Sequence, residues 1–178
     1  DPAPAAARVP GIVVFANNDP VQMNSRNGRP MRIAETQYTR GLYCHAVSRV
    51  LVQLPGPGAT FTSLIGCDNN ENTSGGRGSI IFSVKVAGEE KLRSKVFHGG
   101  DEAVPIEIDL AGATELSLDV DDAGDGIACD QADWAEARVV LQDGQELWLG
   151  DLPILEQRDD SFTTEPPFSF TCTGQPAA

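Results

Sequence analysis

The sequence predicts an all-β protein that folds as a two-sheet antiparallel sandwich. Apolar and polar residues alternate in many short segments at near-regular spacing, and this period of two is typical of strands with one buried face. No amphipathic stretch is long enough to form a helix of about a dozen residues. The chain has 178 residues, the length of about one domain. We therefore expect a single β-sandwich over residues 11–150.

The first half of the chain contains the less regular segments. Residues 11–16 are predicted to form a short buried strand. Residues 17–40 are rich in Asn, Arg, Gly and Pro, so we expect irregular structure with one short strand near residues 31–33. A strand at residues 50–54 ends at a Pro-Gly-Pro-Gly turn, and residues 61–65 form the next strand.

The second half carries the clearest alternation. Apolar residues at 80, 82, 84 and 86 point to one side of a strand and the residues between them point to the other. A turn at residues 87–90 lets the segment 91–97 return antiparallel. Further strands are expected at residues 104–110, 116–120, 137–141 and 146–149.

Both ends of the chain differ from this pattern. Residues 1–10 are expected to form a flexible tail. The first seven are too polar and proline-rich for the apolar region of a signal peptide, and they resemble what remains after one is removed, or an artificial boundary. We therefore expect a secreted or periplasmic protein. Residues 151–178 are expected to be a linker or the start of a following catalytic domain.

The charge balance excludes several classes of partner. The chain has 26 acidic and 13 basic residues, for a net charge of -13. This charge argues against binding to nucleic acid or to an anionic membrane. No apolar run approaches the roughly 20 residues that a membrane span requires.

An acidic stretch at residues 121–134 is the most unusual part of the sequence. Carboxylates held this close raise one another's pKa unless a cation or strong hydrogen bonds compensate them. Calcium fits such a stretch because it takes six to eight oxygen ligands, although the spacing is not that of an EF-hand. A solvated surface turn explains the same composition. The candidate residues, for calcium or for hydrogen bonds within the loop, are Asp122, Asp125, Asp130 and Asp133.

Four cysteines lie far apart in the sequence, at Cys44, Cys67, Cys129 and Cys172. No C-x-x-C motif occurs, so a structural zinc site is not expected. Two disulfides would allow three connectivities, among which the sequence does not choose. Free buried thiols are the alternative.

Three segments together resemble one known family. They are residues 38–46 (YTRGLYCHA), residues 65–69 (IGCDN) and the acidic stretch with its DAGDG motif, Asp130 and the closing Asp-Trp-Ala. In this order they resemble the NPCBM/NEW2 domain, which is carbohydrate-binding module family 51. The resemblance implies a galactose-binding-like jelly-roll sandwich that is attached to glycoside hydrolases, binds galactose-type sugars and often holds a structural calcium. Residues 167–171 also resemble the start of an α-galactosidase catalytic domain.

The resemblance and the residue chemistry together give four candidate sugar-binding residues. A pyranose needs hydrogen-bond partners for its hydroxyls and an aromatic ring for its C–H face. His45 can bond a hydroxyl or a buried carbonyl, and Asp68 and Asn69 can reach a ligand from a strand end or merely close an Asx-turn. Trp134 can form the aromatic platform or belong to the core. We expect His45, Asp68 and Trp134 to converge at one rim.

Three functions fit these residues. The first is a non-catalytic module that recognises galactose-containing glycans and targets an attached glycoside hydrolase. The second is a structural sandwich stiffened by calcium, with no sugar site of its own. The third, a glycosidase with two acidic-loop carboxylates as acid and base, is disfavoured because turn or metal chemistry already explains those carboxylates. No residue is assigned a catalytic role.

Overall fold

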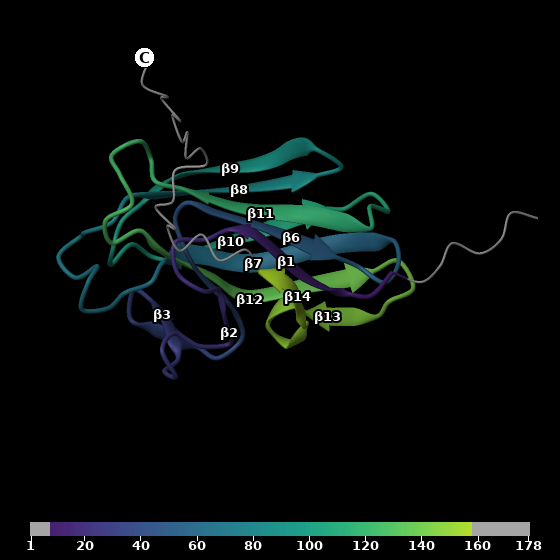
Figure 1. Ribbon diagram of the computed structural model, residues 1–178, viewed down its shortest axis with the longest axis horizontal. Coiled ribbons are helices and arrows are strands. Elements are labelled where there is room, and N and C mark those ends of the chain that lie inside the picture. Colours follow the sequence, from purple (N-terminus) through teal and green to yellow (C-terminus); the bar gives the residue numbers. More distant parts are fainter. Residues whose placement is uncertain (1–7, 158–178) are drawn as a thin grey trace, which may run out of the picture.

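Residues 8–157 are described by the computed structural model, and their strands form two facing sheets (Figure 1). The first sheet contains, in spatial order, β14 (Ile154–Gln157), β1 (Gly11–Ala16), β6 (Ser48–Gln53), β11 (Glu115–Asp121), β8 (Ile80–Val86) and β9 (Glu89–Phe97). The second contains β10 (Val104–Asp109), β7 (Gly58–Cys67), β12 (Gln131–Leu141), β5 (Gly41–His45) and β2 (Gln22–Met23), with β13 (Glu146–Trp148) also paired to β12. The predicted all-β sandwich is therefore confirmed.

One core fills the space between the sheets. In β6, residues alternate between buried and partly exposed along the strand, as the sequence pattern predicts. The apolar side chains of both sheets belong to a single cluster that includes Val50, Phe61, Phe82 and Trp134. Each sheet thus contributes its inner face to the core and keeps its outer face for other contacts.

The predicted irregular segment at residues 17–40 contains more structure than expected. Besides β2 it holds a small hairpin, β3 (Met31–Ile33) and β4 (Thr36–Tyr38). The hairpin is tied to the end of β7, where Ile33 forms an isolated bridge with Asp68. Local composition had obscured these strands because each is only two or three residues long.

The acidic stretch is shorter than its sequence suggested. β12 begins at Gln131, so Asp133 and Trp134 lie inside a long strand and the acidic loop proper comprises residues 122–130. This acidic loop, the loop after β7 and the β3–β4 hairpin all lie at the same end of the sandwich (Figure 1).

The sandwich extends past the boundary expected at residue 150. After a short 3₁₀ helix (Leu149–Asp151), β14 pairs parallel to β1, with Ile12 opposite Ile154. The rest of the predicted linker, residues 158–178, lies outside the described residues, as do Cys172 and the segment 167–171. Within residues 8–157, no helix has the length and apolarity that crossing a bilayer requires.

Candidate functional site

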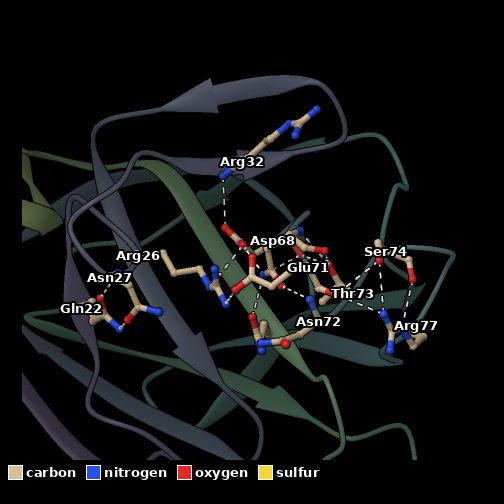
Figure 2. Close-up of polar contacts among 12 residues, drawn as sticks. Gln22, Arg26, Asn27, Arg32, Asp68, Glu71, Asn72, Thr73, Ser74 and Arg77 are labelled. Atoms are coloured by element: carbon tan, nitrogen blue, oxygen red, sulfur yellow. Dashed lines mark hydrogen bonds and ion pairs between the residues drawn. The ribbon is translucent and has the colours of Figure 1, made fainter.

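A polar cleft of about 480 Å³ opens at the loop end of the second sheet. We call it the Arg26 cleft. Its walls come from the segment before β3, the β3–β4 hairpin and the loop that follows β7 (Figure 2). The lining residues are Arg26, Arg29, Pro30, Arg32, Gln37, Asp68, Asn69, Asn70, Glu71 and Ser74.

A tight turn positions Arg26. The backbones of Arg26 and Arg29 exchange two hydrogen bonds, of 2.8 and 3.0 Å, across Asn27 and Gly28. Asn27 and Gly28 both have positive φ, at 50° and 74°. An Asn-Gly pair is the preferred sequence for such a two-residue turn. Gln22 braces the turn by accepting a hydrogen bond from the Asn27 amide at 2.6 Å.

The Arg26 side chain points into the cleft and joins two carboxylates (Figure 2). Its Nη2 lies 3.2 Å from Glu71 Oε1, and its Nε lies 3.6 Å from Asp68 Oδ1. The guanidinium stacks over the buried ring of Tyr43, with 5.8 Å between Cζ and the ring centroid. Burial raises the pKa of Tyr43, so the phenol stays neutral. Arg26 is therefore fixed in position while its charge faces the cleft.

Asp68 forms the buried base of the cleft, with only 2% of its surface exposed. Its Oδ2 accepts a hydrogen bond from the Arg32 amide at 3.1 Å. Its Oδ1 accepts one from the Asn70 side chain at 2.5 Å. Asp68 thus ties the end of β7 to the β3–β4 hairpin, in addition to its ion pair with Arg26. A buried carboxylate held by several donors is a strong organising contact.

The loop after β7 closes around the same carboxylate. The Thr73 hydroxyl donates to the Asp68 carbonyl at 2.6 Å, and the Asn70 side chain also donates to Gln131 Oε1 at 2.7 Å. Asn69 donates its side-chain amide to the Ala34 carbonyl at 2.7 Å. These bonds make the asparagine-rich loop a fixed wall of the cleft.

Beneath the cleft lies a second carboxyl group, that of Asp133. It sits on β12 opposite Tyr43 on one side and Gly66 on the other, and it is fully buried. Neither of its carboxyl oxygens has a hydrogen-bond partner among the described residues. Burial raises the pKa of Asp133 well above its ordinary value, and the charge of nearby Asp68 raises it further. A neutral Asp133 adds no negative charge beneath the ion pair of Asp68 with Arg26.

The expected convergence of His45, Asp68 and Trp134 is not found. Asp68 and Asn69 line the Arg26 cleft, whereas His45 and Trp134 do not. His45 is buried, and its Nδ1 lies 2.9 Å from the Ala46 carbonyl. Of the two roles weighed for this imidazole, the structure shows the bond to a buried carbonyl.

The prediction that Trp134 forms a sugar platform is wrong. Trp134 has no exposed surface. Its ring meets Phe82 edge-on, with 4.9 Å between ring centroids, and Phe61 at 6.4 Å. Because Asp133 points to the outer face of the sheet, the next residue in the strand points into the core. Trp134 is a core residue, and the prediction failed because the acidic residues around it resemble a loop.

The four predicted calcium ligands do not converge on one point. Asp133 lies beneath the cleft, while Asp122 accepts a hydrogen bond from the Gly124 amide at 2.9 Å in a local turn. Asp125 and Asp130 both contact Ser79, at 2.6 Å to its hydroxyl and 2.8 Å to its amide. Within residues 8–157 no group of three or more His, Cys, Asp or Glu side chains is arranged to hold a metal. The four predicted side chains therefore do not form a single ligand set.

Within the acidic loop, burial alters the pKa of Asp130. Burial raises the pKa of Asp130 to about 6, and the charge of Asp125 adds to this effect. The Ser79 amide opposes it by donating to the carboxylate. Asp122 makes its hydrogen bond within the loop, whereas Asp125 and Asp130 bond to Ser79, which precedes β8.

The three cysteines among the described residues are free thiols. Cys44 and Cys67 lie on either side of Ala132 across three neighbouring strands, and both are buried. Burial raises the pKa of Cys44 to about 12, which makes it an unreactive core residue. Among residues 8–157, no disulfide joins Cys44, Cys67 and Cys129.

Comparison with known proteins agrees with the sandwich fold and identifies the family. A model described as the NPCBM/NEW2 domain matches residues 11–140. The chain is 29% identical over 126 residues to a protein named putative endo-alpha-N-acetylgalactosaminidase from Renibacterium salmoninarum; the match covers 67% of this chain and 8% of the relative. The chain thus spans less than a tenth of that relative's length.

Solved structures with the same fold come from Clostridium perfringens. The CBM51 of a GH95 protein in complex with methyl-galactose superposes with a TM-score of 0.65 at 23% identity, over 71% of this chain and 91% of that one. The CBM51-2 domain of ZmpB in complex with GlcNAc gives a TM-score of 0.65 at 23% identity, over 71% of this chain and 28% of that one.

The matched domains are carbohydrate-binding modules and not catalytic domains, in agreement with the expectation that this chain is not an enzyme by itself. The family match covers well over half of the sequence, and the shared architecture is the galactose-binding-like β-sandwich that the resemblance implied. The chain belongs to the NPCBM/NEW2 domain family.

Proposed function

We propose that this module binds galactose-type sugars in the Arg26 cleft and thereby holds an attached glycoside hydrolase near its glycan. One observation carries the proposal: Arg26, Asp68 and Asn70 form a connected polar network whose free faces line a cleft. Preorganised donors and acceptors of this kind suit the clustered hydroxyls of a pyranose.

The cleft offers complementary groups on opposite walls. Arg26 supplies donors, while the exposed Glu71 supplies an acceptor. The volume of about 480 Å³ falls within the range of small-ligand sites, roughly 300–1,000 Å³. No tryptophan or phenylalanine lines the cleft, so hydrogen bonds would carry the binding more than stacking does. We expect dissociation constants between about 1 μM and 1 mM, because few anchors contribute.

The comparisons support the ligand class and the targeting role. The structures of similar fold hold methyl-galactose and GlcNAc, and one of them joins two CBM51 domains to an M60 catalytic domain. A tethered module raises the local concentration of substrate without acting on the chemical step. Such a role places this protein outside the cytoplasm, in a secreted or periplasmic setting where glycans are met.

The test is a titration of the chain with methyl-galactose and with GlcNAc, followed by nuclear magnetic resonance. Arg26→Ala should weaken binding by about tenfold or more, since a charge-assisted hydrogen bond contributes about 1.5–3 kcal/mol. Arg93→Ala is the matched control, because this arginine lies on the first sheet and pairs only with Glu90 at 3.7 Å within the described residues.

Two outcomes would contradict the proposal. Equal affinity of the Arg26→Ala protein and the native protein would show that the cleft is not the sugar-binding site. Failure to bind any glycan on a full array would contradict sugar binding and favour a structural module. Turnover of a chromogenic galactoside by the isolated chain would instead favour the glycosidase.

A further inference from the structure

A second groove lies on the outer face of the same sheet, toward the other end of β12. We call it the outer groove; its volume is about 420 Å³. Strand register aligns four of its side chains in one row across the sheet. Glu107 on β10 stands opposite Thr62 on β7, Thr62 opposite Arg138 on β12, and Arg138 opposite Trp148 on β13.

A bulge in β12 adds a fifth side chain to this row. The pairing of β12 with β7 is interrupted between Ala135 and Arg138, and Glu136 there has a φ of 51°. The Glu136 amide donates to the Arg40 carbonyl at 2.8 Å, which holds the bulge in place. A left-handed backbone costs a non-glycine residue about 1 kcal/mol or more, and bulges often re-aim a side chain beside a binding site. Here the bulge brings Glu136 to the groove.

The aromatic wall of the outer groove is held rigidly. The Arg40 guanidinium lies 4.3 Å from the centroid of the Trp148 ring, and that of Arg138 lies 5.5 Å from it. Arg138 is fixed in turn by Glu146, with 3.1 Å between Nη1 and Oε1. Cation–π contacts of this kind keep an aromatic side chain in one orientation before any ligand arrives.

By contrast, the two remaining acids of the groove have no partner. Neither the Glu107 carboxylate nor the Glu136 carboxylate has a hydrogen bond or ion pair with another described residue. Their carboxylates are free to accept hydrogen bonds from a ligand, while Leu64 contributes an apolar side chain to the lining. Acceptors, a guanidinium, a hydroxyl and an apolar patch are together the complement of a sugar ring.

We propose that the outer groove is a second carbohydrate-binding site, which takes a neutral hexopyranose. Charge decides against acidic sugars, because Glu107 and Glu136 outnumber Arg138 in the groove. Strand addition by a peptide is disfavoured because the edge strand β10 carries Pro105, Glu107 and Asp109, residues that protect an edge from pairing. The two sites occupy different parts of β12: Asp133 lies beneath the Arg26 cleft, and Glu136 and Arg138 lie at the outer groove.

Backbone amide resonances, followed during titration with methyl-galactose, GlcNAc and galacturonic acid, would test this second site. The two neutral sugars should shift Thr62 and Arg138, and galacturonic acid should not. In the double variant Glu107→Gln and Glu136→Gln, the sugar affinity measured from these shifts should fall about tenfold, because charge-assisted hydrogen bonds are lost. Glu102→Gln, an exposed glutamate outside the groove, is the control and should bind as the native protein does.

Separate readouts distinguish the two sites. Arg26→Ala should abolish shifts at Asn70 and leave those at Thr62 and Arg138 unchanged, so either site can fail alone. Glu136→Gly adds a second measurement: it should increase stability, by relieving the positive φ, while it weakens sugar binding at the groove. The inference is overturned if no neutral sugar shifts Thr62 or Arg138, or if the double variant binds as the control does.

Discussion

Two polar loops lie at one end of the sandwich, and they use their charges differently. In the loop at residues 69–74, which closes the Arg26 cleft, bonds run to Asp68 and to β12, and a basic residue balances the buried acid. In the acidic loop at residues 122–130, Asp122 bonds within its own turn, and Asp125 and Asp130 both bond to the neutral Ser79. The acidic loop is richer in charge, yet the cleft is the better organised site. Burial and charge balance, more than the number of carboxylates, make a site.

The largest difference between the two regions should appear when one acid of each, Asp68 or Asp122, is removed. Asp68→Ala is expected to cost about 3 kcal/mol or more in unfolding free energy, because Arg26 and the Arg32 amide lose a buried partner. Asp122→Ala should cost about 0.5 kcal/mol, since it loses one exposed turn contact. Urea denaturation at pH 7 measures both changes. Equal losses would show that the two loops are equally structural.

The pH dependence of stability separates the two buried acids. Folding raises the pKa of Asp133 and of Asp130, so the folded state binds more protons than the unfolded state. Their stabilising effect is complete below the unfolded pKa of about 4 and is lost as the pH rises through the folded value. For Asp130 this window ends near pH 6; for Asp133 it should extend higher.

Substitution of either aspartate by asparagine should prevent the loss of stability that accompanies its ionisation. Asp130→Asn is expected to raise the unfolding free energy at pH 7 by about 1–2 kcal/mol and to flatten its slope between pH 4 and 6. Asp133→Asn should flatten the slope to higher pH. Denaturation curves from pH 4 to pH 8 provide the measurement, with Asp143→Asn, in an exposed turn, as the control. Destabilisation by Asp130→Asn at pH 7 would contradict this account.

Backbone strain gives a smaller contrast between the loops. In the turn that positions Arg26, a left-handed position is held by Asn27, a residue that tolerates it. In the acidic loop, one such position is held by Ala123, at a φ of 53°. Ala123→Gly should therefore stabilise the protein by about 0.5–1 kcal/mol. Asn27→Ala should destabilise it by a similar amount and lower the affinity for sugar. Thermal unfolding resolves both, and a loss of stability in Ala123→Gly would argue that the loop is not strained.

Calcium should have the smallest effect. Because the four predicted ligands do not converge, adding a chelator is expected to change the melting temperature by less than about 1 °C, which corresponds to a few tenths of a kcal/mol. A decrease of several degrees that calcium alone restores would reinstate the structural calcium. Magnesium serves as the control cation.

Much of the fold could be predicted because it depends on periodicity, which the sequence displays directly. Apolar residues recur at every second position in β8 and β11, and both strands were expected near their observed bounds. β12 was placed too late in the chain, because its first residues are acidic and resemble a loop. That one error misassigned Asp133 and Trp134, since the side of a strand on which a residue lies cannot be read until the strand is recognised.

The cleft was only partly predictable. Asp68 and Asn69 could be found because they follow the end of an apolar strand. Arg26 was missed although the Asn27-Gly28 pair after it is a hairpin signal. The paired segments on either side are too short to show a strand pattern in the sequence. Asp68 and Arg26 are 42 positions apart in the sequence, and only the packing of the β3–β4 hairpin brings them together.

The placement of the tryptophans has a consequence for spectroscopy. The chain contains two, one sealed among phenylalanines and the other beside the outer groove. Trp134 should emit at short wavelength and ignore both sugars and quenchers, while Trp148 should respond to each. Intrinsic fluorescence would then be blind to a sugar in the Arg26 cleft and would report on the outer groove alone, so one optical signal tells the two ends of the sheet apart.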